Sequence, residues 1–360
     1  MEVHQVLPTI MRGDAIGNEA IEIHKTLNRW GYRSEIYAEH IHPSCYKIAK
    51  GYTKLFEDPS AMLLYHYSIG SELTSLIHRL PNPLGIIYHN ITPYNYFVGI
   101  NESMVRLLKK GKEELSLLRD RASIALADSE FNRQELVQLG FRNTAILPIL
   151  IDFSRYAVSA DRQMIDKYDD GSVKMLFVGR FTPNKKLEEI MKVFGYYQKC
   201  ISSDSRLFLV GSYLGAEVYH RFLVGLVRKF GLHNVHFVTD PSGGPSKTSE
   251  LVACYQMADV FITMSEHEGF CVPLIESMQF GLPIVAYSAT AIPFVLGGAG
   301  ILISDKNYAE IAEFVQIVVE DQALRRRIVE KQYERLQSFS REKVEASLRS
   351  FLNQLSRRGL

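Results

Sequence analysis

The sequence has few cysteines, almost no net charge and no unbroken apolar run long enough to cross a membrane. Its four cysteines are scattered without a C-x-x-C pair, which argues against a disulfide framework or a zinc site and suits a reducing cytoplasm. The formal net charge of +1 gives no support for nucleic acid as a partner. We therefore expect a cytoplasmic protein that binds no nucleic acid and has no cysteine-based zinc site.

One long uncharged stretch needs a separate explanation. No charged residue occurs between Ser277 and Ser304, a length that would permit a membrane span. Two prolines and a Gly-Gly pair divide this stretch into short apolar runs, which are typical of buried parallel strands. The chain opens with MEVHQVLPTIMRGD, which contains an early acid and reads as a strand, so we expect no signal peptide.

Strand-like apolar runs alternate with amphipathic helical runs along the whole chain. These runs form two series, the first at 3–10, 34–39, 62–68, 85–90, 123–129 and 144–150, and the second at 173–180, 206–212, 235–240, 259–265, 283–288 and 300–304. Successive strand–helix–strand units build parallel sheets, and 360 residues are ordinary for two domains. The sequence therefore predicts an α/β protein with two Rossmann-like, doubly wound domains that face each other across a cleft.

The composition of the connecting segments predicts the domain boundaries. The seam falls near Pro148 and Asp152, which gives a first domain over 1–152 and a second over 153–339. The chain after Asn307 reads almost wholly helical, and its last part, 340–360, is expected to form a helix that packs back on the first domain. Within the first domain, helices are expected near 19–30 and 103–121.

A basic turn follows the first strand of the second domain. In FVGRFTPNKKLEE, Arg180 ends the strand and Lys185 and Lys186 stand at the start of a helix. Cations beside a helix amino terminus can hold a diphosphate without metal, because the free N–H groups and the helix dipole attract the same anion. The alternative is a solvated basic turn in which Glu188 and Glu189 pair with the lysines.

Two carboxylates flank a strand-to-helix turn in SEHEGFCVPLIESMQFGLP. Glu268 stands just before the helix and Glu276 about one turn inside it, and Gly269 permits close approach of the backbone to a ligand. A carboxylate accepts two hydrogen bonds in the spacing of a vicinal diol. Amides that open the helix could bind the same ligand, namely those of Phe270, Cys271 and Val272. The alternative is that one acid caps the helix and the other is solvated.

Two further motifs follow strands of the first domain. MRGDAIGNEA places Gly13 and Gly17 between a strand and a helix, but it is not G-x-G-x-x-G, so a dinucleotide fingerprint is absent. The loop could approach a ligand, or it could be an ordinary flexible turn. IIYHNITPYNYF puts His89 and Asn90 at the carboxyl end of a strand, where a histidine can also be a core or capping residue.

The order of these motifs resembles the retaining GT-B glycosyltransferases, specifically glycosyltransferase family 4. VGRFTPNKK, then SEHEGFCVPLIESMQFGLPIVA about ninety residues later, and then GGAGILI resemble the family's donor domain. ALADSEFNRQELVQLG followed by ILPILID resembles the end of its acceptor domain and its linker. The resemblance covers nearly the whole chain and is weakest at 41–60 and at the carboxyl end.

The resemblance implies an enzyme of a definite kind. It would move a hexosyl group, with mannosyl as one candidate, from a nucleoside diphosphate sugar to a glycan or lipid-linked acceptor, with retained configuration and without metal or other cofactor. The setting would be surface polysaccharide or glycoconjugate synthesis. The domain 1–152 would be on the acceptor side, and 153–339 would bind the donor. Lys109, Lys110 and Lys112 could then dock the chain peripherally on the inner face of a membrane.

The resemblance also implies roles for single residues. The family's E-x(7)-E element maps onto Glu268 and Glu276, and its arginine-lysine pair maps onto Arg180 and Lys185. Arg180 and Lys185 would neutralise the departing diphosphate, Glu276 would hold the ribose, and Glu268 would bind the donor sugar with Gly269, Phe270, Cys271 and Val272. His89, Gly13 and Gly17 would approach the donor from the first domain, and Asp14, Asn18 and Asn90 are expected on the acceptor side.

Some features depart from the family or leave alternatives open. Cys271 stands where glycine is common, and the segment VTDPSGGPSKTSE is rich in glycine and serine beside the expected base pocket. No D-x-D motif suited to a catalytic metal is present. The rival interpretations are a nucleotide-sugar epimerase of the same fold and a non-catalytic partner of a glycosyltransferase complex. A dehydrogenase would need the glycine fingerprint that is missing.

Overall fold

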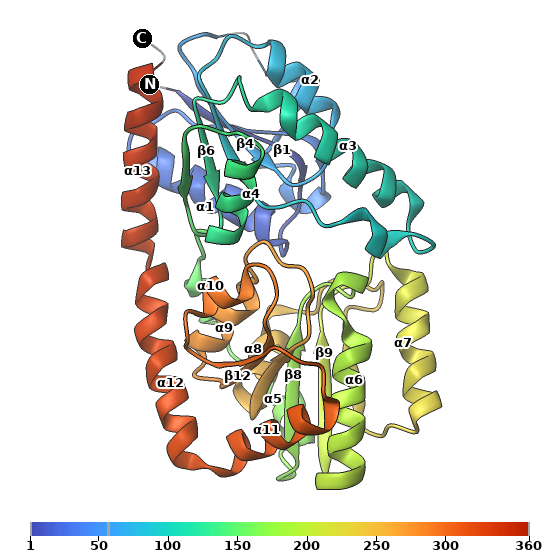
Figure 1. Ribbon diagram of the computed structural model, residues 1–360. Helices are drawn as coiled ribbons and strands as arrows, with labels where there is room; N and C mark the ends of the chain where they lie inside the picture. The colour runs from blue at the N-terminus through green and yellow to red at the C-terminus, as the bar shows by residue number, and fades with distance from the viewer. Residues whose placement is uncertain (1, 56–57, 359–360) are drawn as a thin grey trace. The chain divides into compact units, whose positions relative to one another are not determined.

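The computed structural model describes residues 2–55 and 58–358 and divides into two compact units (Figure 1). Unit 1 takes its residues from 1–95, 102–152 and 339–360, and unit 2 from 96–101 and 153–338. The segment 96–101 thus groups with unit 2, although it lies between two stretches of unit 1. In the described part of the chain, no helix combines the length and the apolar character that a membrane crossing requires.

Unit 1 is built on a parallel sheet of seven strands. The strand order is β3-β2-β1-β4-β5-β6-β7, so the chain winds outward in both directions from β1 and β4. The strands read as continuous apolar runs because both faces of the sheet are covered. They are β1 (Val3–Ile10), β2 (Ile36–Ile41), β3 (Lys50–Gly51), β4 (Met62–Tyr67), β5 (Leu84–Tyr88), β6 (Ile124–Ala127) and β7 (Thr144–Ile146).

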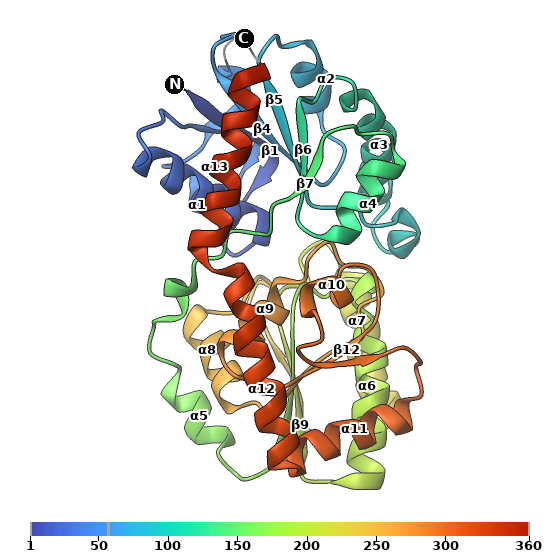
Figure 2. The ribbon, with the colours of Figure 1, turned by 60° about the vertical axis from the view of Figure 1, so that its left-hand side comes forward.

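Helices cover both faces of this sheet. Figures 1 and 2 show α1 (Ala15–Arg29) and α13 (Arg341–Arg358) on one side and α2 (Glu72–Arg79) and α3 (Glu102–Leu118) on the other; α4 (Glu130–Gln138) follows β6. The apolar side chains of α13 recur every three or four residues and therefore line one face of the helix. That face is buried in the core of unit 1 through Val344, Leu348, Leu352 and Leu355.

Helix α1 begins four residues earlier than the sequence analysis predicted. Asp14 caps its amino terminus, and the Asp14 side chain accepts a hydrogen bond from the Gly17 amide. Gly17 therefore lies in the first helical turn and not in a loop. A Cβ atom added to Gly17 would lie 2.2 Å from the carbonyl oxygen of Met11. The glycine is accounted for by close packing of α1 against the end of β1.

Unit 2 contains a parallel sheet of six strands with the order β10-β9-β8-β11-β12-β13. This is the Rossmann order, and its switch point lies between β8 and β11. The strands are β8 (Val173–Val178), β9 (Ser205–Val210), β10 (Val235–Val238), β11 (Val260–Thr263), β12 (Ile284–Tyr287) and β13 (Ile301–Ile303). The predicted fold class of two Rossmann-like, doubly wound sheets is confirmed.

The helices of unit 2 form a layer on each face of its sheet (Figures 1 and 2). One layer, which shares the largest apolar core, consists of α6 (Leu187–Tyr196), α7 (Glu217–Phe230) and α11 (Tyr308–Glu320). The other consists of α5 (Arg162–Tyr168), α8 (Thr248–Met257), α9 (Val272–Gln279) and α12 (Gln322–Leu336); the short α10 (Ile292–Leu296) follows β12. Both faces of the sheet are therefore covered, as in unit 1.

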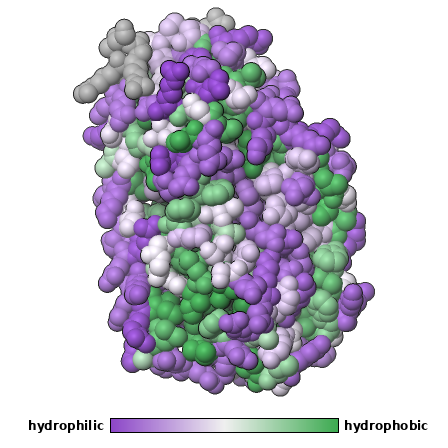
Figure 3. All heavy atoms as spheres, in the orientation of Figure 1, coloured by the Kyte–Doolittle hydropathy of each residue, from purple (hydrophilic) through white to green (hydrophobic). Residues whose placement is uncertain are grey.

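One face of α7 stays uncovered. Val218 and Phe222 of α7, and Leu214 in the turn before it, are each more than two-fifths exposed. Figure 3 shows hydrophobic side chains along the right-hand edge of the molecule, over α7. This face takes no part in the core of unit 2.

Replacing Gly17 with alanine is expected to destabilise unit 1 by roughly 1–3 kcal/mol, because the new methyl group must displace backbone atoms of Met11. The matched control is Gly225→Ala in α7, where an added Cβ atom meets nothing within 4 Å. That change removes a helical glycine and is expected to stabilise by about 0.5–1 kcal/mol. Urea denaturation measures both variants, and equal effects would contradict the packing argument.

Candidate functional site

The candidate site of unit 2 lies where β8 and β11 end side by side. In open parallel sheets, ligands bind outside the carboxyl ends of the strands at the switch point. The loop 179–186 follows β8, and the loop 264–271 follows β11. The backbone also approaches closely here, because a Cβ atom on Gly211 at the end of β9 would lie 1.9 Å from the Gly179 carbonyl oxygen. The two predicted motifs of this unit therefore come together.

Hydrogen bonds hold these two loops in register. The Glu266 amide donates to the Asn184 carbonyl at 2.9 Å, and the Asn184 side-chain amide donates to the His267 carbonyl at 3.0 Å. On the other side, the Thr290 hydroxyl accepts from the Glu268 amide at 2.9 Å and donates to the Glu268 carbonyl at 3.0 Å. Glu268 is thus anchored through its backbone, which leaves its carboxylate for other partners.

The Glu268 carboxylate pairs directly with Lys185. Nζ of Lys185 lies 2.5 Å from Oε2 of Glu268, and the two side chains are only 19% and 8% exposed. The alternative pairing, with the acids of α6, does not involve Lys185: Glu188 pairs with Lys186 at 3.6 Å, and Glu189 pairs with Lys192. The structure therefore joins one residue from each predicted motif in a mostly buried ion pair.

A second cluster surrounds Glu266 beside this pair. Glu266 accepts from Lys306, and Lys186 lies 3.4 Å from the same carboxylate. Tyr96, from the segment that groups with unit 2, donates its hydroxyl to Glu266 at 3.1 Å. Burial opposes ionisation of Glu266, but the neighbouring lysines bring its pKa below the ordinary value. The sequence analysis missed Lys306, which stands in no recognisable motif, and Tyr96, which lies in the IIYHNITPYNYF motif but was not singled out there.

Arg180 differs from these lysines. It directly follows Gly179 after β8 and is exposed, and it forms no ion pair with another described residue. A guanidinium carries five donors in a planar fork that matches phosphate oxygens. At this sheet edge, Arg180 is therefore the cation best able to meet an incoming anion without first leaving a carboxylate.

The turn before α9 is compact and strained at Cys271. Cys271 has a left-handed backbone with a φ of 73°, a conformation that favours glycine. Its thiol is buried, and burial raises the pKa of Cys271 well above the ordinary value, so the thiol stays neutral. Phe270 is buried, Gly269 and Val272 are partly exposed, and α9 begins at Val272. The turn brings these backbone amides to the start of α9 as expected.

Glu276 is more enclosed than the sequence analysis expected. It is 5% exposed, and both carboxylate oxygens already accept hydrogen bonds. The Tyr156 hydroxyl donates to Oε1, and the Tyr255 hydroxyl donates to Oε2 at 2.6 Å. A diol could bind this carboxylate through the lone pairs that the two phenols leave or by exchange with a phenol. Sequence patterns give no sign of these tyrosines, which lie 120 and 21 positions away.

In unit 1, the predicted glycine loop forms a helix cap. The Gly13 amide donates to the Asn18 side chain at 3.0 Å, and Asp14 accepts from the Gly17 amide at 3.4 Å. These four residues therefore satisfy one another at the start of α1. The missing side chain of Gly17 makes room for the Met11 carbonyl, and the approach of Gly17 to a ligand stays a prediction.

Asn90 also bonds within unit 1. It has a left-handed backbone with a φ of 76° directly after β5, and its side chain is buried. Its amide nitrogen donates to Asn132 at 2.8 Å and to Glu135 at 3.1 Å, both on α4. These bonds tie the end of β5 to α4. The Asn90 amide nitrogen is therefore engaged inside the unit, and an acceptor-side role of Asn90 stays a prediction.

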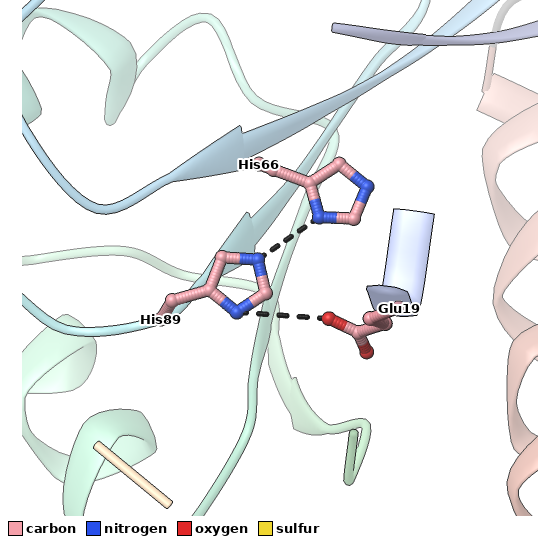
Figure 4. A group of neighbouring side chains, drawn as sticks. All are labelled: Glu19, His66 and His89. Carbon is pink, nitrogen blue, oxygen red and sulfur yellow. Dashed lines mark hydrogen bonds and ion pairs between the residues drawn. The ribbon is translucent and has the colours of Figure 1, made fainter. Parts of the chain in front are cut away.

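His89 lies in a buried polar network at the ends of β4 and β5 (Figure 4). Its Nδ1 donates to Asp128 at 2.9 Å, and its Nε2 faces Nδ1 of His66 at 2.9 Å. Glu19 of α1 lies 3.7 Å from Nδ1 of His89. Both ring nitrogens therefore have protein partners and the side chain is 2% exposed, so a sugar contact by His89 would require exchange of one of these partners, and the contact stays a prediction.

The same three residues are the candidate metal ligands of the described chain. Ligand atoms of Glu19, His66 and His89 lie within 4.8 Å of one another, and no other such group occurs in 2–55 and 58–358. Two nitrogens on one tetrahedral zinc ion, with bonds of about 2.0–2.1 Å, would stand roughly 3.3 Å apart. The two imidazole nitrogens here are 2.9 Å apart, which is a hydrogen-bond length. The geometry therefore favours a hydrogen bond over a metal.

The basic face of α3 is largely compensated. Lys110 pairs with Glu72 and lies 3.6 Å from Glu114, and Lys112 lies 3.9 Å from Glu135. Lys109 stacks over the Tyr94 ring, with Nζ 4.4 Å from the ring centre. The uncompensated positive charge of this face is therefore smaller than the sequence suggests.

Comparisons with known proteins agree with the fold. Residues 161–335 match the family model described as Glycosyl transferases group 1. A crystal structure of Anabaena HepE in complex with UDP and glucose superimposes with a TM-score of 0.73 over 98% of this chain and 100% of that chain, at 16% identity. The chain has the GT-B fold. The family match covers most of unit 2 and includes both motifs of the candidate site.

Two curated relatives are similar to parts of this chain. O-antigen chain mannosyltransferase B of Escherichia coli is 25% identical over 244 residues, which are 64% of this chain and 59% of the relative. D-inositol 3-phosphate glycosyltransferase of Corynebacterium glutamicum is 25% identical over 181 residues, 49% of this chain and 42% of the relative. The GT-B chain thus spans about half the length of these relatives, and both are glycosyltransferases by name.

Proposed function

We propose that this protein is a retaining, metal-independent glycosyltransferase of family 4. It moves a mannosyl or related hexosyl group from a nucleoside diphosphate sugar to a glycan or lipid-linked acceptor in surface polysaccharide or glycoconjugate synthesis. The mannosyl choice is supported by the name of the Escherichia coli relative. The family model that matches unit 2 supports donor binding there.

The observation that carries this proposal is the cationic group at the switch point of unit 2. Lys185 lies in the 3₁₀ turn η5 (Pro183–Lys185) just before α6, and it pairs with Glu268 just before α9. Arg180 is exposed beside them. Two cations, two helix amino termini and an acid thus occur at one sheet edge. The cations and the helix amino termini would bind a diphosphate, and the acid would accept hydrogen bonds from sugar hydroxyls.

Donor binding would rearrange the charges of this group. The diphosphate would bind Arg180 and draw Lys185 toward its oxygens, because a dianion is the stronger partner for an ammonium group. Glu268 would then be released to accept hydrogen bonds from sugar hydroxyls. The ion pair therefore keeps both side chains in place before the donor arrives, and the cost of exchanging partners is offset by the phosphate contacts.

The transfer step would use the same cations. The bond between the anomeric carbon and the phosphate oxygen breaks as the acceptor oxygen forms a new bond from the same face. The acceptor proton passes to the departing phosphate oxygen. Arg180 and Lys185 would stabilise the negative charge that grows on the diphosphate, and Glu276 would exchange a tyrosine partner for the ribose diol.

Donor specificity can be read from thermal stability. GDP-mannose is expected to raise the unfolding temperature by several degrees, because a ligand present at 100 times its dissociation constant stabilises the native state by about 2.7 kcal/mol. UDP-, dTDP- and ADP-sugars serve as comparisons in the same differential scanning assay. The shift should shrink in Arg180→Ala but not in Arg326→Ala on α12, where the side chain is also exposed. If none of these sugar nucleotides changes the unfolding temperature, the proposal fails.

Product analysis distinguishes transfer from its rivals. Incubation with donor and a glycan acceptor should yield an elongated glycan and a nucleoside diphosphate. An epimerase would instead yield a new sugar nucleotide from donor alone, and a non-catalytic partner would bind donor and yield neither. Flotation with anionic vesicles tests the proposed peripheral location on the inner face of a membrane.

A further inference from the structure

We propose that His66 and His89 share a single proton between their facing nitrogens, and that His66 is a positioning residue that holds His89 fixed as part of a charged pair. The pair belongs to unit 1 and lies at the ends of β4 and β5 (Figure 4). The inference does not rest on the proposed function, because every contact that supports it lies within unit 1.

The outer nitrogen of each ring carries a proton. The Gln5 side chain donates its amide nitrogen to the Ala20 carbonyl at 2.9 Å, so its oxygen remains as the acceptor. That oxygen lies 2.9 Å from Nε2 of His66, which must therefore be the donor. In the same way, Nδ1 of His89 donates to the Asp128 carboxylate at 2.9 Å.

The inner nitrogens then need a proton between them. With both outer nitrogens protonated, two neutral rings would point lone pair against lone pair across the 2.9 Å that separates Nδ1 of His66 from Nε2 of His89. The rings are nearly parallel, with an interplanar angle of 4°, and both are buried. One additional proton turns this repulsion into a hydrogen bond and gives the pair a charge of +1.

Buried acids balance this charge. Asp128 is hydrogen-bonded to His89 and supplies one negative charge, while burial raises the pKa of Glu19 to about 8, so that Glu19 stays protonated at neutral pH. The other titratable group acting on His89 is Asp14, before α1. One imidazolium, one carboxylate and one carboxylic acid make a buried cluster without net charge. A cluster of this kind avoids the cost of an unpaired buried charge.

The cluster fixes the sheet edge that carries the unit's switch point. It joins β1 through Gln5, β4 through His66, β5 through His89 and α1 through Glu19, and Asp128 extends it to the end of β6. The strained step at Asn90 follows His89 directly. The shared proton therefore acts as a cross-link between elements that are distant in the sequence.

The cluster makes stability depend on pH with a definite sign. Burial opposes charge on His89, but the Asp128 carboxylate and, once it ionises, Glu19 raise the pKa of His89 to about 9, above the ordinary 6.5. The stabilisation by this group is therefore complete below about pH 6.5 and is lost as the pH rises through 9. The raised pKa of Glu19 also makes the stability fall as the pH rises from 4.5 to 8. Burial and the neighbouring His89 lower the pKa of His66. His66 therefore makes the stability rise with pH, and only below pH 6.5.

Nitrogen-15 NMR of the histidine side chains in the full chain tests the proposal. At pH 7 we expect a proton on Nε2 of His66, a proton on Nδ1 of His89, and one strongly downfield proton coupled to both inner nitrogens. A neutral pair in which His66 carries its proton only on Nδ1 would overturn the proposal. So would one equivalent of zinc per chain by elemental analysis, with both inner nitrogens at metal-bound shifts.

Two variants separate proton sharing from simple packing. In His66→Gln the amide can donate to Nε2 of His89, and in Gln5→Leu the His66 ring can move its proton to Nδ1; both changes should leave His89 neutral. In each variant the unfolding temperature should fall less between pH 7 and 9.5 than in the wild type. His24 lies on α1 outside the cluster, so His24→Gln should show the same fall as the wild type. An unchanged fall in His66→Gln would refute the proposal. If a variant does not fold, the wild-type spectrum still decides, and none of these measurements depends on sugar transfer.

Discussion

Replacing Arg180 with alanine is expected to lower the rate of sugar transfer by about 10²- to 10³-fold while leaving the fold intact. The size follows from the loss of one preorganised donor to a developing negative charge, which is typically worth that much in catalysis. The fold should survive because Arg180 is exposed and forms no ion pair with another described residue. Steady-state kinetics with donor and acceptor measure kcat and KM separately.

Two comparison variants make the Arg180 experiment specific. Arg180→Lys keeps the charge but loses the two-pronged geometry, so its rate should fall between the wild type and Arg180→Ala. Arg326→Ala removes an exposed arginine of the same unit from α12 and should leave the rate unchanged. If the folded Arg180→Ala variant keeps full transfer activity, Arg180 does not stabilise the diphosphate.

Replacing Glu268 with glutamine should reduce transfer by about 10²-fold or more. The change removes the acceptor proposed for sugar hydroxyls and also leaves Lys185 without its carboxylate partner. Glutamine has nearly the same size, so the turn before α9 should keep its packing. Because the free lysine can still bind phosphate, we expect kcat to fall more than the affinity for the nucleoside diphosphate product.

Glu189→Gln is the matched control for Glu268→Gln. Glu189 is about equally buried in unit 2 and also pairs with a lysine, but its carboxylate bonds to Lys192 and Tyr308 rather than to Lys185. Both variants should lose similar stability in urea denaturation, and only Glu268→Gln should lose transfer. If the two variants lose transfer equally, Glu268 has a structural role alone.

The sheets and the main site of unit 2 could be predicted because their signals are local. Parallel strands buried on both faces leave continuous apolar runs, and these runs match the strands from β1 to β13 apart from β3. The short edge strand β3 has only two residues, too few to produce a pattern. Lys185 and Glu268 meet because each follows one of two neighbouring strands, and a parallel sheet brings such strand ends to one edge.

The rest of the site could not be predicted because it depends on partners far apart in the sequence. The tyrosines that hold Glu276 and the histidine that faces His89 are chosen by packing, which no spacing rule records. The start of α1 was misplaced for a different reason. Gly17 was interpreted as part of a loop, although Asp14 is a favourable cap and glycine can enter a helix where the backbone of another segment lies close.

The position of α13 has a consequence for synthesis on the ribosome. Unit 1 takes its first strands from the beginning of the chain but completes its core with a helix that is translated after all of unit 2. While residues 153–338 are being made, the side chains that α13 will cover, among them Val3, Ile23 and Leu27, have no partner from that helix. Unit 2 can therefore mature first, whereas unit 1 must wait, with part of its apolar surface available to chaperones, until α13 leaves the exit tunnel.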